Sequence, residues 1–414
     1  MEKQYQLIVY DGFKEDDIIH HLITLKDPNV TYENFSEHYY KLCEKLIKYG
    51  NQYKWKGNLL IQYVAFQLLN HENTFSLMYE KKLKDYNHPI LELVDKEVEH
   101  IIDLLNIQIE DITLKMNSNL LKTLFNYEAP SYHWNLNRYY KKVYNELEKG
   151  NKKETINGLM DFFYNVGVGA YAWYKAFRWD EDKLTPIKEV DRYQLEDLIG
   201  IEIQKKKVID NTEAFLKGCK ANNVLLYGDS GTGKSSTIKA ILNEYYQDGL
   251  RMIEVYKYQF KDLPKIIDVI SDRQYKWILF FDDLSFEEFE IEYKYLKATI
   301  EGSLEKKRDN LLIYATSNRR NLIKETWKDR VMAEDEVHTN DTMEEKLSLA
   351  DRFGLSIMFL TPNRKEYLKI VKEKAEKANI DIDEERLKDL ALKWEIQHSS
   401  FSGRVAEQFI NTLK

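Results

Sequence analysis

The residues from 224 to 242, VLLYGDSGTGKSSTIKAIL, constrain the fold of this chain more than any other part of its sequence. They match the pattern G-x-x-x-x-G-K-[ST] from Gly228 to Ser235. An apolar run precedes the match, and a stretch with helical spacing follows it. Strand, glycine-rich turn and helix in this order are typical of an α/β domain whose turn is a phosphate-binding loop, or P-loop. The alternative is an ordinary glycine-rich turn before a helix, which the flanking strand and helix disfavour.

The residue types of this turn suit a nucleoside triphosphate with magnesium. The glycines allow the backbone to fold so that successive amides point at phosphate oxygens, and the following helix directs its positive dipole end to the same place. Lys234 would neutralise the β and γ phosphates, and Ser235 would coordinate Mg²⁺. The predicted cofactor-binding residues of the turn are Gly228, Asp229, Ser230, Gly231, Thr232, Gly233, Lys234, Ser235 and Ser236.

A second element is the run ILFFDD, in which apolar residues end at Phe281 and two aspartates follow. Asp282 fits the acid that holds magnesium through water, so Ser235 and Asp282 are the predicted metal ligands. Asp283 stands where most such sites carry glutamate. We interpret it as a catalytic base whose side chain is one methylene shorter. The alternative is a strand followed by an acidic turn, which the P-loop upstream disfavours.

A third run, LLIYATSN, ends in the polar residues Thr316, Ser317 and Asn318. These groups are well placed to orient a water against the terminal phosphate, although Asn318 could equally be a turn former. In open α/β sheets ligands lie outside the carboxyl ends of the strands, so polar residues at three strand ends favour a shared phosphate site. Asn318 is therefore a predicted catalytic residue.

Two arginines complete the predicted catalytic set. Arg352, in EEKLSLADRFGLSIMFL, lies at the end of a predicted helix just before the last strand. From there its guanidinium could reach the γ phosphate of a neighbouring subunit. Arg404, in FSGRVAEQFI, opens the last predicted helix and could contact phosphate. Taken singly, each arginine is more often a surface ion-pair partner, so the prediction depends on the whole set.

Hydrophobic spacing divides the chain into parts of different type. Apolar residues recur at helical spacing between about residues 32 and 177, which predicts an all-helical N-terminal domain at 1–180. The charges and the proline of RWDEDKLTPIKEV predict a linker at 181–192. Five short β-rich runs then alternate with helical stretches, which predicts an α/β core at 193–362 with a five-stranded, mainly parallel sheet. Helical spacing returns at 363–414 as a small lid.

Composition disfavours several classes of protein. A formal net charge of −8 provides no global basic surface for nucleic acid. Cys43 and Cys219 have no companions at metal-ligand spacing, so neither a disulfide framework nor a zinc site is expected. The N-terminus shows no basic segment followed by an apolar one, and the longest apolar run is too short for a bilayer. We therefore expect a cytoplasmic protein with no membrane partner.

From about Tyr193 to the C-terminus, these motifs together resemble an AAA+ ATPase module. The segments DDLSFE, YATSNRR, LSLADRFGL and SGRVA are most similar to the bacterial DUF815 family, a domain of unknown function. The resemblance implies Mg²⁺-ATP as the ligand and hydrolysis gated by contacts between subunits of a homo-oligomer. It implies Walker B at Asp282 and Asp283, sensor 1 at Asn318, the arginine finger at Arg352, sensor 2 at Arg404, and an adenine frame at Leu198, Ile199 and Gly200.

The leading functional hypothesis is an ATPase that couples binding and hydrolysis of Mg²⁺-ATP to the remodelling or switching of an unidentified macromolecular partner. The N-terminal domain would then bind that protein client. One alternative is a nucleotide-responsive scaffold or adaptor with little hydrolysis. Another is a P-loop kinase, which is disfavoured because the helical lid that bears Arg404 follows the fifth strand instead of being inserted within the core. Nucleic acid is a further partner to test, since the aromatic residues of YHWNLNRYY could stack on bases, although such residues more often belong to a core.

Overall fold

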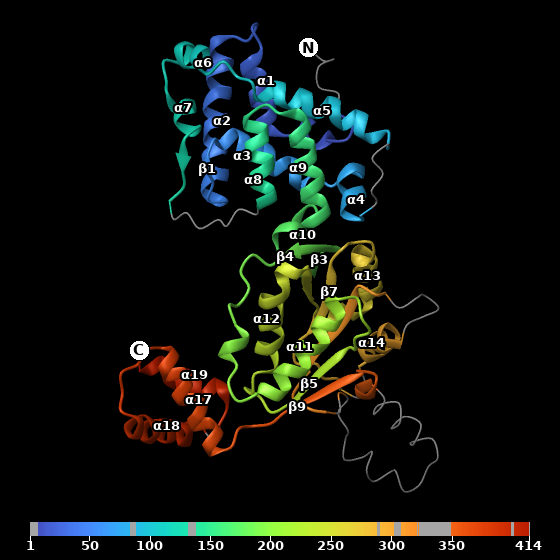
Figure 1. Ribbon diagram of the computed structural model, residues 1–414, viewed down its shortest axis with the longest axis vertical. Helices are drawn as coiled ribbons and strands as arrows, with labels where there is room; N and C mark the ends of the chain where they lie inside the picture. The colour runs from blue at the N-terminus through green and yellow to red at the C-terminus, as the bar shows by residue number, and fades with distance from the viewer. Residues whose placement is uncertain are drawn as a thin grey trace. The chain divides into compact units, whose positions relative to one another are not determined.

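The computed structural model divides the chain into two compact units, Met1–Trp173 and Tyr174–Lys414 (Figure 1). It describes residues 7–82, 88–130, 138–287, 290–301, 308–320, 322, 349–398 and 401–413. Within these ranges, no helix has the length and apolar character needed to cross a membrane. Most of the YHWNLNRYY segment lies outside the described residues.

The first unit is a helical bundle around a core of its own, which includes the buried residues Tyr39, Leu68, Phe162 and Phe163. Polar side chains cap several of its helices; for example, Asn58 accepts hydrogen bonds from the first-turn amides of α3 (Leu59–Asn70). A short antiparallel ladder, β1 (Lys56–Gly57) with β2 (Tyr127–Glu128), is a small exception to the predicted all-helical domain. The helices are α1 (Asp17–Lys26), α2 (Tyr32–Gln52), α3 (Leu59–Asn70), α4 (Thr74–Glu80), α5 (Ile90–Leu105), α6 (Ile109–Met116), α7 (Leu120–Leu124), α8 (Arg138–Glu148), α9 (Lys152–Asn165) and α10 (Ala170–Trp173).

The second unit begins with a β-hairpin, where the sequence predicted the end of a helical domain and a linker. β3 (Ala176–Asp180) pairs antiparallel with β4 (Lys183–Pro186). Between them, Glu181 and Asp182 have positive φ angles of 46° and 58°, the left-handed pair that closes a tight hairpin. The charges of this stretch thus belong to a turn. The predicted linker at 181–192 is a strand over part of its length, because residues 183–186 form β4 and pair with β3.

Seven strands form the sheet of this unit, in the order β4-β3-β6-β7-β8-β5-β9. The five strands predicted from the sequence are present and parallel to one another, and the hairpin adds two at one edge. Because neighbouring parallel strands end on the same side, the carboxyl ends of β5, β7 and β8 lie close together. The predicted strands are β5 (Val224–Gly228), β6 (Leu250–Glu254), β7 (Lys276–Phe281), β8 (Leu311–Ser317) and β9 (Leu355–Phe359).

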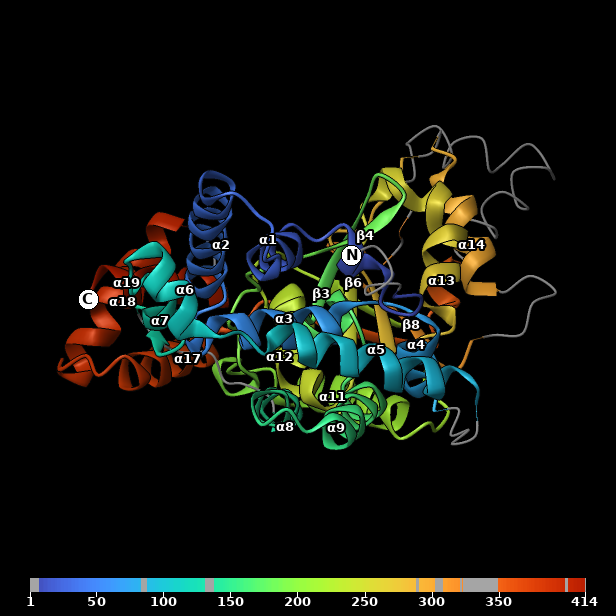
Figure 2. The same ribbon diagram turned by 90° about the horizontal axis from the view of Figure 1, so that it is seen from above.

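Helices cover both faces of the sheet. α11 (Glu202–Leu216) and α12 (Lys234–Tyr245) lie on one face, and α13 (Leu263–Ser271) and α14 (Glu292–Glu301) lie on the other (Figures 1 and 2). Buried residues of α11 and α12 pack with the strands in one apolar cluster, which includes Val208, Ile238 and Phe280. Because both faces of the strands are buried, their sequences are nearly continuous apolar runs, as is expected for a parallel sheet covered on both sides.

After β9 the chain forms a separate helical lid with its own small core. Its helices are α17 (Arg364–Lys377), α18 (Glu384–His398) and α19 (Gly403–Thr412), coloured red in Figure 1. Asn363 and Glu366 form a capping box that fixes the start of α17, and Ser402 caps α19. With its parallel sheet, the P-loop after β5 and the lid after β9, this unit has the α/β core and helical lid that the sequence predicted.

Candidate functional site

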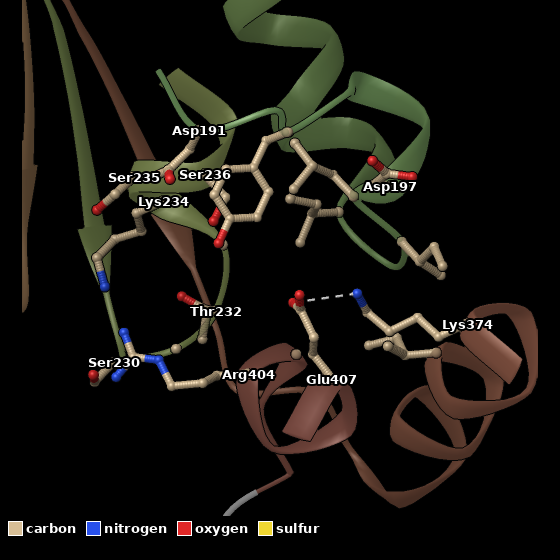
Figure 3. A pocket seen from close by; sticks show the side chains of 18 of the residues that line it. Asp191, Asp197, Ser230, Thr232, Lys234, Ser235, Ser236, Lys374, Arg404 and Glu407 are labelled. Carbon is tan, nitrogen blue, oxygen red and sulfur yellow. Dashed lines mark ion pairs between the residues drawn. The ribbon is translucent and has the colours of Figure 1, made fainter. Parts of the chain in front are cut away.

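A pocket of about 800 Å³ lies at the carboxyl ends of the parallel strands, between the sheet and the lid (Figure 3). The turn before α12 and the ends of β7 and β8 form one wall. Residues 191–201 and the lid helices α17 and α19 form the others. The pocket is therefore large enough for a small organic ligand and has walls from several distant parts of the sequence.

The P-loop has a backbone that only glycine adopts easily. Gly228, Gly231 and Gly233 have φ angles of 134°, 74° and 98°. A Cβ atom at Gly228 would lie 1.9 Å from the carbonyl oxygen of Phe359 on β9, so the two strands approach too closely for any side chain there. The glycines thus form the tight turn expected of a phosphate-binding loop.

Lys234 folds back over this turn. Its Nζ donates to the carbonyl oxygens of Gly228 and Asp229 at 2.8 and 2.6 Å, and to Asn318 Oδ1 at 3.1 Å. Burial lowers the pKa of Lys234, while nearby aspartates act in the opposite direction. The ammonium group therefore stands inside the turn, where phosphate oxygens could replace the carbonyl oxygens as acceptors.

Asp282 connects the P-loop with two strand ends. Its Oδ1 accepts hydrogen bonds from Ser235 Oγ and from Thr316 Oγ1, each at 2.6 Å. Hydroxyl and carboxylate oxygens are the ligands that Mg²⁺ prefers, and it usually keeps several waters. In the described part of the chain, no cluster of three or more His, Cys, Asp or Glu could hold a metal. Ser235 Oγ and Asp282 Oδ1 are oxygen donors of the kind that would fit Mg²⁺.

Asp283 is held by the same group of residues. Its φ of 52° is unusual for a residue other than glycine. Its amide donates to Thr316 Oγ1 at 2.9 Å, and its Oδ1 accepts from Asn318 Nδ2 at 2.7 Å. Asn318 therefore bridges Lys234 and Asp283, and Thr316 bridges the two aspartates. The structure brings together the three strand ends that the sequence singled out.

Arg404 reaches the site from the lid. It lies in the first turn of α19, and its amide donates to the carbonyl oxygen of Gly231 at 3.3 Å. Its exposed side chain lines the pocket beside the P-loop (Figure 3). The predicted sensor 2 position is thus adjacent to the phosphate-binding turn.

Arg352 lies near the amino ends of the parallel strands, whereas the P-loop lies at their carboxyl ends. It precedes β9, whose first residue pairs with Val224 at the start of β5 and whose last pairs with Gly228. At about 3.3 Å per strand residue, that length separates Arg352 from the P-loop by roughly 15 Å. Arg352 does not line the pocket. Within one chain it stands apart from the other predicted catalytic residues.

The predicted adenine frame lies between the core and the lid. Leu198 packs with the core of the sheet, whereas Ile199 belongs to the lid cluster with Ile370. Leu198 and Ile199 line the pocket; Gly200 has a φ of 81°, and a Cβ there would lie 3.3 Å from Ile370. This segment is therefore the apolar strip across which the lid meets the core.

Several pocket residues were not predicted from the sequence. Lys374 of α17 and Glu407 of α19 form an ion pair at 3.5 Å in the lid wall (Figure 3). Glu407 and Asn411 follow Arg404 at helical spacing on one face of α19, which is a signal that sequence reading could have used. Other unpredicted lining residues are Asp191, Arg192, Tyr193, Asp197, Ile201, Ile370, Lys377, Ala378, Gly403 and Ile410.

A comparison with protein-family models matches residues 172–414 to the family described as protein of unknown function, DUF815. The match covers more than half of the chain. This chain belongs to the DUF815 family. A comparison of this DUF815 protein with curated proteins found no match. The resemblance predicted from its motifs is thereby confirmed, and the family description itself names no activity.

Solved structures similar to this DUF815 protein include RuvB and DnaA. A mutant RuvB of Thermotoga maritima has a TM-score of 0.38 and 18% identity, covering 54% of this chain and 65% of that chain, just under two thirds of its length. The T. maritima RuvB Holliday junction branch migration motor has a TM-score of 0.33 and 15% identity, covering 53% and 72%. AMPPCP-bound DnaA from Aquifex aeolicus has a TM-score of 0.36 and 22% identity, covering 53% and 64%.

Proposed function

We propose that this DUF815 protein binds Mg²⁺-ATP in the pocket between sheet and lid and hydrolyses it to ADP and phosphate. One observation carries the proposal: a continuous set of hydrogen bonds joins the P-loop lysine and serine to both aspartates through Thr316 and Asn318. A structural turn needs none of these contacts. A phosphate site needs a cation, a metal ligand and a water-orienting group at one place.

The residues of the chain would share the work as follows. Lys234 would exchange its carbonyl acceptors for phosphate oxygens, and the amides of the glycine-rich turn would donate to the same group. Ser235 and Asp282 would hold Mg²⁺, which supplies charge neutralisation at the phosphates. Leu198 and Ile199 would contact the base. The lid would bring Arg404 to the phosphates.

Asp283 would act as the base that polarises the attacking water. Asn318 and Thr316 fix its side chain and its amide, so it has little freedom to move. Its second carboxylate oxygen has no hydrogen-bond partner among the residues that the structure describes, which leaves it available for water. The left-handed backbone at Asp283 sets the direction of this shorter side chain, and such unusual backbone conformations are common at active sites.

Assembly would complete the site. Arg352 lies too far from its own P-loop to act there, so its predicted role requires a neighbouring subunit whose phosphate site faces it. Turnover would then couple to contacts between subunits of a homo-oligomer. The helical N-terminal unit would bind the macromolecular partner that the ATPase cycle remodels or switches.

The proposal is tested on the full chain by measuring ATP affinity and phosphate release in parallel. We expect Lys234→Ala to weaken ATP binding by roughly 10- to 100-fold, because one charged hydrogen-bond donor is lost. Asp283→Asn should bind ATP with nearly unchanged affinity and release phosphate about 100-fold more slowly. Asp283→Glu, which restores the longer carboxylate, is the matched variant that should retain turnover.

Each outcome separates one reading from the others. Tight ATP binding by the assembled wild-type protein without phosphate release would favour the nucleotide-responsive scaffold or adaptor. Phosphate release only with an added acceptor would favour a kinase. Turnover by Asp283→Asn at the wild-type rate would remove Asp283 from the role of base.

A further inference from the structure

Asp229, the first residue after Gly228 in the P-loop, makes its side-chain contacts away from the nucleotide pocket. Its Oδ2 accepts from the backbone amide of Thr361 at 3.1 Å and from Thr361 Oγ1 at 2.7 Å. Its own amide donates to the carbonyl oxygen of Phe359 at 3.2 Å. Asp229 does not line the pocket. One carboxylate oxygen of this P-loop residue thus binds Thr361, which follows the last strand.

Thr361 lies in the short connection between the sheet and the lid. β9 ends at Phe359, and Asn363 caps the first lid helix, α17, with Glu366. This connection is the covalent link through which the lid continues from the core. The Asp229 carboxylate therefore binds the chain at the point about which the lid would turn.

The same residue also contacts the predicted phosphate-binding lysine. Lys234 Nζ donates to the carbonyl oxygen of Asp229 at 2.6 Å. The lid touches the P-loop a second time, where the amide of Arg404 donates to the carbonyl oxygen of Gly231 at 3.3 Å. The beginning of the turn is thus bound by the entry to the lid, and its middle by the last lid helix.

An acidic residue in a phosphate-binding turn carries a cost, because its charge repels the phosphates. The Thr361 hydroxyl and then the Thr361 amide hold the pKa of Asp229 below its ordinary value, so the carboxylate stays charged and keeps its direction. A neutral residue would avoid the repulsion if the position had no other role. The placement of the charge argues for a specific task at the hinge.

We propose that Asp229 is a positioning residue that ties the P-loop to the lid hinge through Thr361, so that lid closure and the placement of Lys234 change together. This inference deepens the proposed function and rests on nucleotide binding in the pocket. When Lys234 Nζ exchanges the Asp229 carbonyl oxygen for phosphate, the P-loop and the connection at Thr361 change position together. Because this connection leads into the lid, the lid closes over the nucleotide and slows its dissociation.

The test uses Thr361→Val in the full chain, with Thr361→Ser as the matched control that keeps the hydroxyl. Dissociation of fluorescent methylanthraniloyl-ADP and methylanthraniloyl-ATP is followed by stopped flow, and hydrogen exchange of residues 359–366 is measured without nucleotide. We expect Thr361→Val to speed dissociation of both nucleotides about two- to tenfold, since one hydrogen bond is lost. KM should rise with kcat unchanged. Exchange at the hinge should accelerate, and Thr361→Ser should resemble the wild type.

Two results would overturn the inference: wild-type hinge exchange in Thr361→Val, or wild-type dissociation despite faster exchange. A double-mutant cycle with Asp229→Asn adds a check on coupling, because additive effects on hinge exchange would show that the two side chains act independently. Failure of the wild type to bind either labelled nucleotide would instead refute the proposed function. The exchange measurement without nucleotide would still decide whether the tie exists.

Discussion

Replacing Thr316 by valine isolates the contact on which both aspartates depend. Thr316 is 1% exposed, and its hydroxyl donates to Asp282 Oδ1 at 2.6 Å while it accepts from the Asp283 amide at 2.9 Å. Valine has nearly the same shape and can do neither. The substitution should therefore leave the packing of β8 intact and release Asp283 from its left-handed conformation.

The expected magnitude follows from these two hydrogen bonds. A bond to a charged group contributes about 1.5–3 kcal/mol and a neutral one about 1 kcal/mol, and water can partly replace both because the aspartates are exposed. We expect a loss of about 2 kcal/mol in the free energy of unfolding, or about 4–8 °C in the Tm of a unit of this size. A loss of about 1.4 kcal/mol in the orientation of Asp283 would lower the turnover rate about tenfold.

The assay measures ATP affinity, phosphate release and thermal unfolding for Thr316→Val and for two controls. Thr316→Ser keeps the hydroxyl and should turn over ATP normally. Thr212→Val removes a buried hydroxyl of α11 that bonds Val208 and Tyr314, so it should cost similar stability and leave turnover unchanged. Wild-type turnover by Thr316→Val, with the stability loss present, would refute the idea that Thr316 orients the catalytic carboxylate.

Three further predictions test other parts of the chain. Gly228→Ala should lower the free energy of unfolding by about 4 kcal/mol or more and abolish ATP binding, because its Cβ would lie 1.9 Å from a carbonyl oxygen of β9. Calorimetry measures the loss, and Gly249→Ala is the control, since Gly249 also has a positive φ but nothing within 4 Å of an added Cβ. Arg352→Ala should bind ATP normally and lose turnover at concentrations where the protein assembles, and an unchanged rate per protomer in an assembled sample would contradict the trans role. Burial, followed by the charge of His38, lowers the pKa of His21 to about 4. Below about pH 6.5 the folded first unit therefore binds fewer protons than the unfolded chain, and it should lose stability as the pH falls toward 4. Hydrogen exchange of α1 should show this loss, and His21→Gln should reduce it.

The aspartate that replaces glutamate at position 283 has a structural context that the sequence alone does not reveal. Its left-handed backbone is held by Thr316, and its side chain by Asn318. Thr316 lies near the end of β8, the strand beside β7, and Asn318 directly follows it. Asp283, which we propose as the base, is thus held at both its amide and its carboxylate.

The sequence by itself determined which strand ends meet at the candidate site. Alternating β-rich runs and helical spacing predicted five parallel strands, and parallel strands must end on one side, so Gly228, Asp282 and Asn318 had to lie near one another. The glycines of the P-loop carry their own conformational signal. These features follow from backbone geometry and from sequence patterns within short segments, so they can be predicted without knowing how the segments pack.

Tertiary structure alone decided the lid wall of the pocket and the edge of the sheet that the hairpin forms. Lys374 and Glu407 meet because two lid helices pack together. The charged stretch that the sequence predicted as a linker forms the β3–β4 hairpin, because β3 pairs with β6 in the sheet. The bond between Asp229 and Thr361 joins residues 132 positions apart. Such contacts depend on how elements pack, and packing depends on the summed shape of many side chains rather than on any local pattern.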